Sequence, residues 1–180
     1  MKTWELAFKD AFVSGSAASL ASTVALAAAS QFEAGHPAAA LNSTSHWLWG
    51  DREAKTDEVS LRHTGVGFVT HHASAYFWAV LYERFAGELA ESSVQSAFMA
   101  GLGTAAVACA VDYSLAPRRL TPGFELRLSK PAMAAGFVAF GLGLAGVGIQ
   151  RQSGARHERQ LPRQRQVSRQ PQEAVAIAAS

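Results

Sequence analysis

The chain has 180 residues, of which 49% are hydrophobic and 17% are charged, and its formal net charge is +2. This length suits a single domain. The single cysteine, Cys109, excludes an intramolecular disulfide and any zinc or iron–sulfur site built from several cysteines. The charges are unevenly placed, because four segments carry none at all: 11–32, 64–82, 92–111 and 131–150.

These charge-free segments predict the fold class. A soluble helical protein spreads charged residues along its helices to make polar faces. Four separate gaps instead match the ~20 apolar residues that a helix needs to cross a bilayer. The sequence therefore predicts an all-α integral membrane protein, with a four-helix transmembrane bundle in residues 1–150 and a disordered basic tail in residues 151–180.

The first segment, 11–32, is rich in alanine and serine, which allow close helix packing. A cleaved signal peptide is an alternative, since Ala27–Ala29 offers a small-residue cleavage site. Glu5 and Asp10 offset the leading lysines, however, and serines dilute the apolar core. We therefore favour a retained helix.

A long polar connection, 31–63, follows the first segment. His46, Trp47, Trp49 and Asp51 lie close together in it and are typical of a stretch in the headgroup layer.

The second segment, 64–82, contains adjacent histidines, His71 and His72, at about 14–15 Å of helix rise past Arg62. Ionisable residues near the bilayer midplane are candidates for function. Together with His46 and His63 they are candidate ligands of a metal or haem, or members of a proton relay. The alternative is neutral imidazoles that hydrogen-bond to neighbouring helices. Adjacent residues point about 100° apart, so one helix cannot offer both rings to one ion.

Glu83 closes the second segment, and we interpret it as a helix-end charge that reaches the membrane interface. The third segment has small residues at four-residue spacing, Ser93–Ala97–Gly101–Ala105–Cys109, and the fourth has the row Ala135–Ala139–Gly143. Both rows predict close helix packing. The tail is rich in Gln, Arg, Ser and Pro, which is typical of disorder, and no nucleic-acid-binding motif accompanies its arginines.

Four crossings place both termini on one side of the membrane. The tail arginines tip the balance of Lys and Arg toward cytoplasmic termini. The two long connections then form a polar cap on the opposite side. A carboxylate–imidazole metal site is one hypothesis for this cap, with the candidate ligands Asp51, Asp112, Glu125, His46 and His63. A lipid-phosphate site at Arg118 and Arg119 is the second. The third is a solvated, ion-paired loop.

The stretches LNSTSHWLWGD, HHASAYFWAVLYE and DYSLAPRRLTPGFE resemble small bacterial inner-membrane proteins with four transmembrane helices, a group of uncharacterised activity. The resemblance implies only a location in the bacterial inner membrane and the helix count.

No H-E-x-x-H, P-loop or G-x-S-x-G pattern is present. We expect a non-enzymatic accessory or oligomer-forming membrane subunit, whose partners are the lipid bilayer and either further copies of the chain or another membrane protein, not nucleic acid. The alternative is a metal- or haem-binding redox or ion-handling protein that uses the histidines of the second segment. A transporter or channel is disfavoured by the small number of spans.

Overall fold

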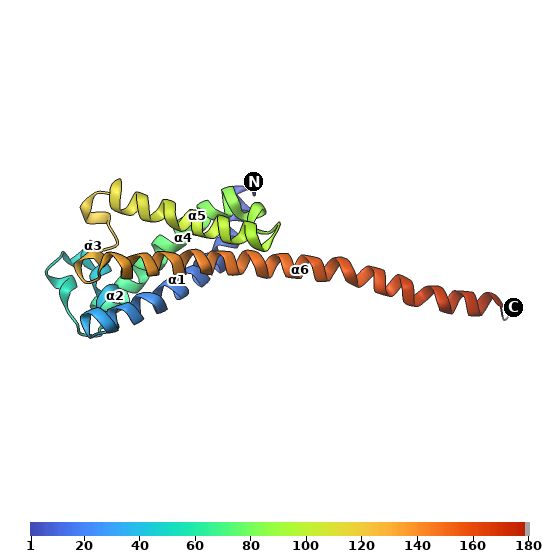
Figure 1. Cartoon of the computed structure of the whole chain (residues 1–180), viewed down its shortest axis with the longest axis horizontal. Coiled ribbons are helices and arrows are strands. Elements are labelled where there is room, and N and C mark those ends of the chain that lie inside the picture. Colours follow the sequence, from blue (N-terminus) through green and yellow to red (C-terminus); the bar gives the residue numbers. More distant parts are fainter. Residues whose placement is uncertain (179–180) are drawn as a thin grey trace.

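The computed structural model describes the backbone of residues 1–178, and the side chains of residues 1–157 apart from residue 53. Every secondary-structure element in this part of the chain is helical, which confirms the all-α prediction. Four long helices form the body of the molecule (Figure 1): α1 (Trp4–Ala34), α4 (Val66–Ala90), α5 (Val94–Ser114) and α6 (Lys130–Ala178). Two short helices, α2 (Ala39–Thr44) and α3 (His46–Trp49), lie at one end of it.

Single turns of helix complete the two long connections: Glu53–Lys55, Leu61–Gly65, Arg118–Leu120 and Phe124–Leu126. Side-chain caps mark where α1 and α5 begin. The Thr3 hydroxyl accepts a hydrogen bond from the Leu6 amide, and Ser93 caps α5 in the same way. Gly35, at φ 76°, ends α1 in the left-handed conformation that glycine adopts without strain.

Glycines allow the long helices to approach closely. A Cβ at Gly101 of α5 would lie 2.3 Å from the Gly141 carbonyl oxygen of α6, and one at Gly143 would lie 2.6 Å from the Ala18 Cα of α1. A Cβ at Gly15 would lie 3.1 Å from Ala79 of α4. The small-residue rows of the third and fourth segments therefore pack within the chain, as their spacing predicts.

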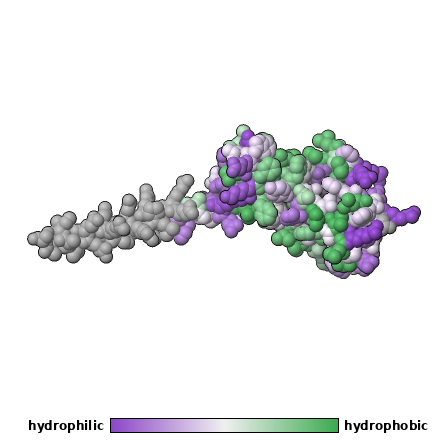
Figure 2. Space-filling model, turned by 180° about the vertical axis from the view of Figure 1, so that it is seen from behind, coloured by the Kyte–Doolittle hydropathy of each residue, from purple (hydrophilic) through white to green (hydrophobic). Residues whose placement is uncertain are grey.

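Burial in the bundle is the reverse of that in a water-soluble protein. In α1 the buried positions are small or polar, such as Ser14 and Ser19, both fully buried, with Leu26 as the large apolar exception. The exposed positions are large and apolar, such as Phe12 (70% exposed), Leu20 (56%) and Val24 (69%). Figure 2 shows hydrophilic residues gathered mainly at the two ends of the bundle, with mostly hydrophobic and neutral ones between them. This arrangement suits an apolar solvent around the helices.

Among the described residues, three helical stretches are long and apolar enough to cross a membrane: α1, α5 and Lys130–His157 of α6. The second predicted segment lies mostly in α4, which is not among the three. Its two histidines and Glu83 lower its hydropathy. The crossing of α4, and with it the count of four, stays a prediction.

The backbone of α6 continues as a helix from Lys130 to Ala178, into the residues for which the sequence predicts a disordered tail. Arginine, glutamine, glutamate and alanine make up much of residues 151–178, and these residues have high helix propensities. A polar composition therefore does not by itself exclude helix.

Candidate functional site

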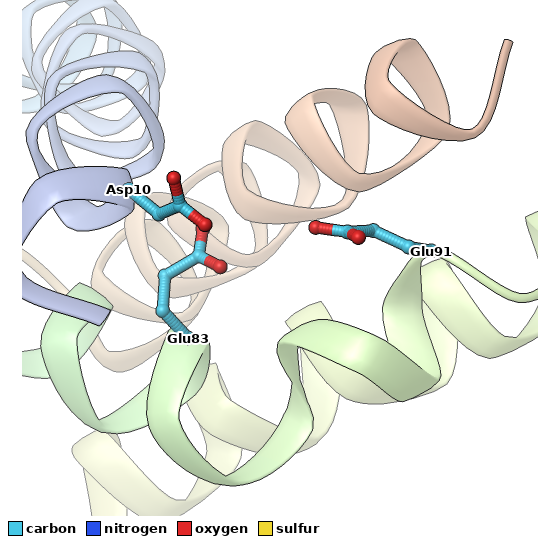
Figure 3. Close-up of side chains that lie close together, drawn as sticks. All are labelled: Asp10, Glu83 and Glu91. Carbon is cyan, nitrogen blue, oxygen red and sulfur yellow. The ribbon is translucent and has the colours of Figure 1, made fainter. Parts of the chain in front are cut away.

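Five charged residues meet at the end of the bundle opposite α2 and α3. We call them the ion cluster, and they are Lys2, Asp10, Glu83, Glu91 and Arg151. Lys2 precedes α1 and Asp10 lies in it, Glu83 lies in α4 and Glu91 caps its end, and Arg151 lies in α6. Figure 3 shows the three carboxylates turned toward one another from α1 and α4. The cluster thus joins three of the four long helices.

The Lys2 ammonium group is the centre of the cluster. Its Nζ donates to Asp10 Oδ2 at 2.7 Å, to Glu83 Oε2 at 2.7 Å and to Glu91 Oε1 at 2.6 Å. The side chain of Lys2 is 5% exposed and that of Glu83 is fully buried. All three donor hydrogens of the ammonium group are therefore used, each on a carboxylate.

Arg151 holds the same carboxylates from the side of α6. Its Nη1 donates to Glu83 Oε1 at 2.8 Å, and its Nη2 donates to the backbone oxygen of Asp10 at 3.1 Å. Glu83 therefore accepts a charge-assisted bond on each of its two oxygens, one from each cation.

Gly87, one helical turn after Glu83, makes room for Lys2. A Cβ at this position would lie 2.8 Å from Glu83 Oε2 and 3.0 Å from Lys2 Cε. Any larger residue would displace the lysine side chain or the carboxylate it binds. Glycine at position 87 is thus part of the site.

The electrostatics of the cluster are nearly balanced. Burial alone would lower the pKa of Lys2, but hydrogen bonds to Asp10, Glu83 and Glu91 outweigh it and raise that pKa above its ordinary value of 10.5. Two cations face three carboxylates, which leaves a formal charge of −1 on the cluster. Asp10 and Glu91 are partly exposed, at 22% and 32%, so solvent screens part of this charge.

Glu83 is not a helix-end charge that reaches out to solvent, because α4 continues to Ala90. Its side chain is fully buried between Lys2 and Arg151. The misplacement has a physical reason: a carboxylate at a helix end needs water only when no cation reaches it inside the protein.

The three carboxylates of the cluster also have the spacing of a cation site. Ligand oxygens of Asp10, Glu83 and Glu91 lie within 4.8 Å of one another, the one such group of His, Cys, Asp or Glu within the described residues. The Lys2 ammonium lies in hydrogen-bond contact with all three, in the place that a metal ion would take. The geometry is therefore that of an internal ion pair network that fastens helices.

The two histidines of α4 point to different surroundings. His71 Nε2 lies 2.9 Å from the Ser22 hydroxyl of α1, and its ring contacts Phe124 edge to face. His72 stacks on Phe68, and its buried Nδ1 has no hydrogen-bond partner among the described residues. The structure does not bring the two rings to a common point.

The other two candidate histidines, His46 and His63, lie near the end of the bundle that carries α2 and α3. His46 is 4% exposed, with Nε2 2.9 Å from the Thr121 carbonyl oxygen and Nδ1 3.2 Å from Asp51. His63 lies beside Ser60, with Nδ1 3.2 Å from its hydroxyl. Both nitrogens of His46 already face oxygen acceptors, so a metal would have to replace one of these contacts.

The residues of the predicted polar cap are held by separate contacts. Glu125 accepts a hydrogen bond from the Thr121 hydroxyl at 2.7 Å, and Arg119 donates to the Trp47 carbonyl at 3.4 Å. Asp112 lies apart, in the wall of an internal cavity. Arg118 is exposed. The two long connections thus contact each other, but their charged groups do not form one site.

The ion cluster was missed by reasoning from the sequence, although a signal for it exists. Four of its members border the charge-free segments at the same predicted side of the membrane. Asp10 precedes the first segment, Glu83 follows the second, Glu91 precedes the third and Arg151 follows the fourth. Charges of both signs at one end of antiparallel helices can pair.

Comparison with known proteins gives no match, whether to a family model, to a curated protein or to a solved structure. The functional interpretation therefore depends on the geometry of this chain.

Proposed function

We propose that this protein is a multi-pass bacterial inner-membrane protein whose four long helices all cross the bilayer, with both termini in the cytoplasm, and that it acts as a non-enzymatic subunit. The observation that carries the proposal is the inverted burial of the bundle. Many large apolar side chains face outward, while serine, alanine and glycine fill most of the helix contacts beside a few large residues such as Phe140 and Leu144. Lipid around the helices removes the cost of exposing such side chains.

The crossing of α4 is supported by its length, by its outward side chains and by the pairing of Glu83. Its 25 residues give a length of about 37 Å, enough for a ~30 Å hydrocarbon core. Its outward side chains include Val69 (67% exposed) and Phe77 (57%), and its buried ones include Ala75 and Ala79. The carboxylate of Glu83 is neutralised inside the bundle and does not have to face lipid.

Labelling of single cysteines distinguishes four crossings from three. In a Cys109→Ser background, Glu58→Cys marks the first long connection and Ser92→Cys marks the turn between α4 and α5. If α4 crosses, a membrane-impermeant maleimide labels only position 58 in intact spheroplasts and reaches position 92 after lysis. Labelling of both positions before lysis would mean that α4 stays on one side. Cys109→Ser without an added cysteine is the control.

The subunit role is supported by an outward face of small residues on α5. Gly103, Ala106 and Ala110 are exposed, and a Cβ at Gly103 would meet nothing within 4 Å. Such a face lets another helix approach closely, from a second copy or from a partner membrane protein. Light scattering in mild detergent tests this: Ala106→Trp should reduce the mass of the assembly. A monomeric wild type without a co-purifying protein would contradict the role.

A metal- or haem-binding function is the second candidate, because of the unpartnered Nδ1 of His72. A ligand on this nitrogen would satisfy a buried polar atom that is otherwise costly. The absorbance spectrum and elemental analysis of purified protein test it. A Soret band or stoichiometric metal that His72→Ala removes and His36→Ala keeps would support the function. A colourless, metal-free wild type would exclude it.

A further inference from the structure

A cavity of about 580 Å³ lies inside the half of the bundle that is nearer to α2 and α3. All four long helices contribute to its wall, and none of its lining residues belongs to the ion cluster. Small-molecule sites in proteins have volumes of ~300–1,000 Å³. The cavity therefore has the size of a binding site for one small molecule.

The wall of the cavity is largely aromatic. Six aromatic side chains line it, from two of the long helices, α4 and α6, and from both long connections: Trp47, Phe77, Trp78, Phe124, Phe137 and Phe140. Aromatic faces carry partial negative charge, so they attract cations as well as apolar groups.

Asp112 of α5 is the one carboxylate among the described lining residues, and no lysine or arginine lines the cavity. Trp78 is its polar neighbour in the wall, and no ion pair to Asp112 occurs among the described residues. A carboxylate in a largely apolar wall is stabilised by an opposite charge. The cavity thus combines one negative group with aromatic surfaces and lacks a cation of its own.

The mouth of the cavity opens on the outer surface of the bundle. Val69 and Phe77 of α4 and Leu120 after α5 belong to its lining and are 67%, 57% and 48% exposed. Apolar side chains at the entrance favour a molecule that arrives with an apolar part leading, as one dissolved in the membrane would.

We propose that this cavity binds an amphipathic organic cation, an ammonium or other onium ion carried on an apolar body. The charge would lie against Asp112 and the indole of Trp78, and the apolar body among the phenylalanines. A fatty chain without a charge would leave Asp112 unpaired, and an anion would be repelled by it. The carboxylate of Asp112 and the aromatic side chains together therefore select one class of ligand.

Two probes of nearly equal shape and opposite charge test the proposal. Binding of tetraphenylphosphonium and of tetraphenylborate to the full chain in detergent is measured by equilibrium dialysis, with protein-free micelles as the blank. We expect saturable binding of about one phosphonium per chain and none of the borate. Equal binding of both ions, or of neither, would overturn the proposal.

Variants assign the binding to the cavity. Asp112→Asn keeps the shape of the side chain and should weaken phosphonium binding at least ~10-fold, as loss of a partly buried ion pair does. Glu58→Gln removes an exposed carboxylate elsewhere on the chain and should leave the affinity unchanged. Ala73→Trp, at the exposed lip of the cavity, should weaken binding without changing charge. Unchanged affinity in both Asp112→Asn and Ala73→Trp would place the binding elsewhere and refute the proposal. The measurement is made in detergent, so its outcome is independent of the number of membrane crossings.

Discussion

Replacing Lys2 by methionine tests whether the ion cluster fastens the bundle. Methionine keeps much of the length of the side chain and removes the ammonium group. The three carboxylates that bind Nζ at 2.6–2.7 Å would then face a single cation, Arg151. The formal charge of the cluster would change from −1 to −2 in a place where Glu83 is fully buried.

The expected loss of stability follows from these contacts. Removing one partner of a buried ion pair costs ~3–5 kcal/mol. We expect the low end, about 3 kcal/mol, because Arg151 still pairs with Glu83 and because Asp10 and Glu91 are partly exposed to solvent. For a chain of 180 residues this corresponds to a decrease in Tm of about 6–12 °C.

The single cysteine provides the assay. Cys109 is half-buried, and a maleimide dye that fluoresces on reaction with it reports unfolding in detergent. Lys9→Met, at an exposed lysine in the first turns of α1, is the matched control and should leave Tm nearly unchanged. Adding Glu83→Gln to Lys2→Met should recover part of the loss, because it reduces the formal charge of the cluster from −2 to −1. A Lys2→Met protein as stable as the Lys9→Met control would refute the role of the cluster.

Three further predictions concern pH, packing and room for the lysine. Because folding raises the pKa of Lys2, the stabilisation that Lys2 gives the folded protein is complete below pH 10.5 and is lost as the pH rises through the folded-state pKa. The difference in Tm between wild type and Lys2→Met should therefore shrink in alkali. A difference that stays constant with pH would contradict this. Gly101→Ala should destabilise the folded protein by about 2 kcal/mol in thermal unfolding, since the added Cβ meets the α6 backbone. Gly103→Ala, two residues away in open space, is the control and should be neutral or stabilising by up to ~1 kcal/mol. Equal effects of the two substitutions would show that α5 and α6 do not pack closely. Gly87→Ala should lower Tm in wild type but much less in the Lys2→Met background, because the displaced side chain is then uncharged; the same loss in both would mean that Gly87 does not serve Lys2.

The helical class and the position of the long helices followed from the sequence because both depend on local patterns. Charge-free runs mark where apolar helices lie, and the row that includes Gly101 predicted a close contact that the structure shows against Gly141. The tail was less predictable. Its composition fits both disorder and helix, and the choice between them depends on continuity with the preceding helix α6.

The candidate site was beyond prediction in detail because it depends on pairing across long stretches of sequence. Lys2 and Glu91 are 89 residues apart, and Arg151 and Asp10 are 141 apart. In the sequence, His71 and His72 are more conspicuous than these residues, because they interrupt an apolar run. A local pattern reveals a residue that is unusual for its segment, but not which residue from another helix will meet it.

The order in which the chain is synthesised gives the ion cluster a further consequence. Lys2, Asp10, Glu83 and Glu91 leave the ribosome before Arg151, so the nascent protein holds three acidic groups against one lysine until α6 is made. The turn between α4 and α5 is only three residues long, which favours early pairing of these two helices. The last helix then brings the second cation. Assembly of the bundle is therefore completed by Arg151, and a ribosome stalled before codon 151 should leave a loosely packed intermediate that proteases can attack.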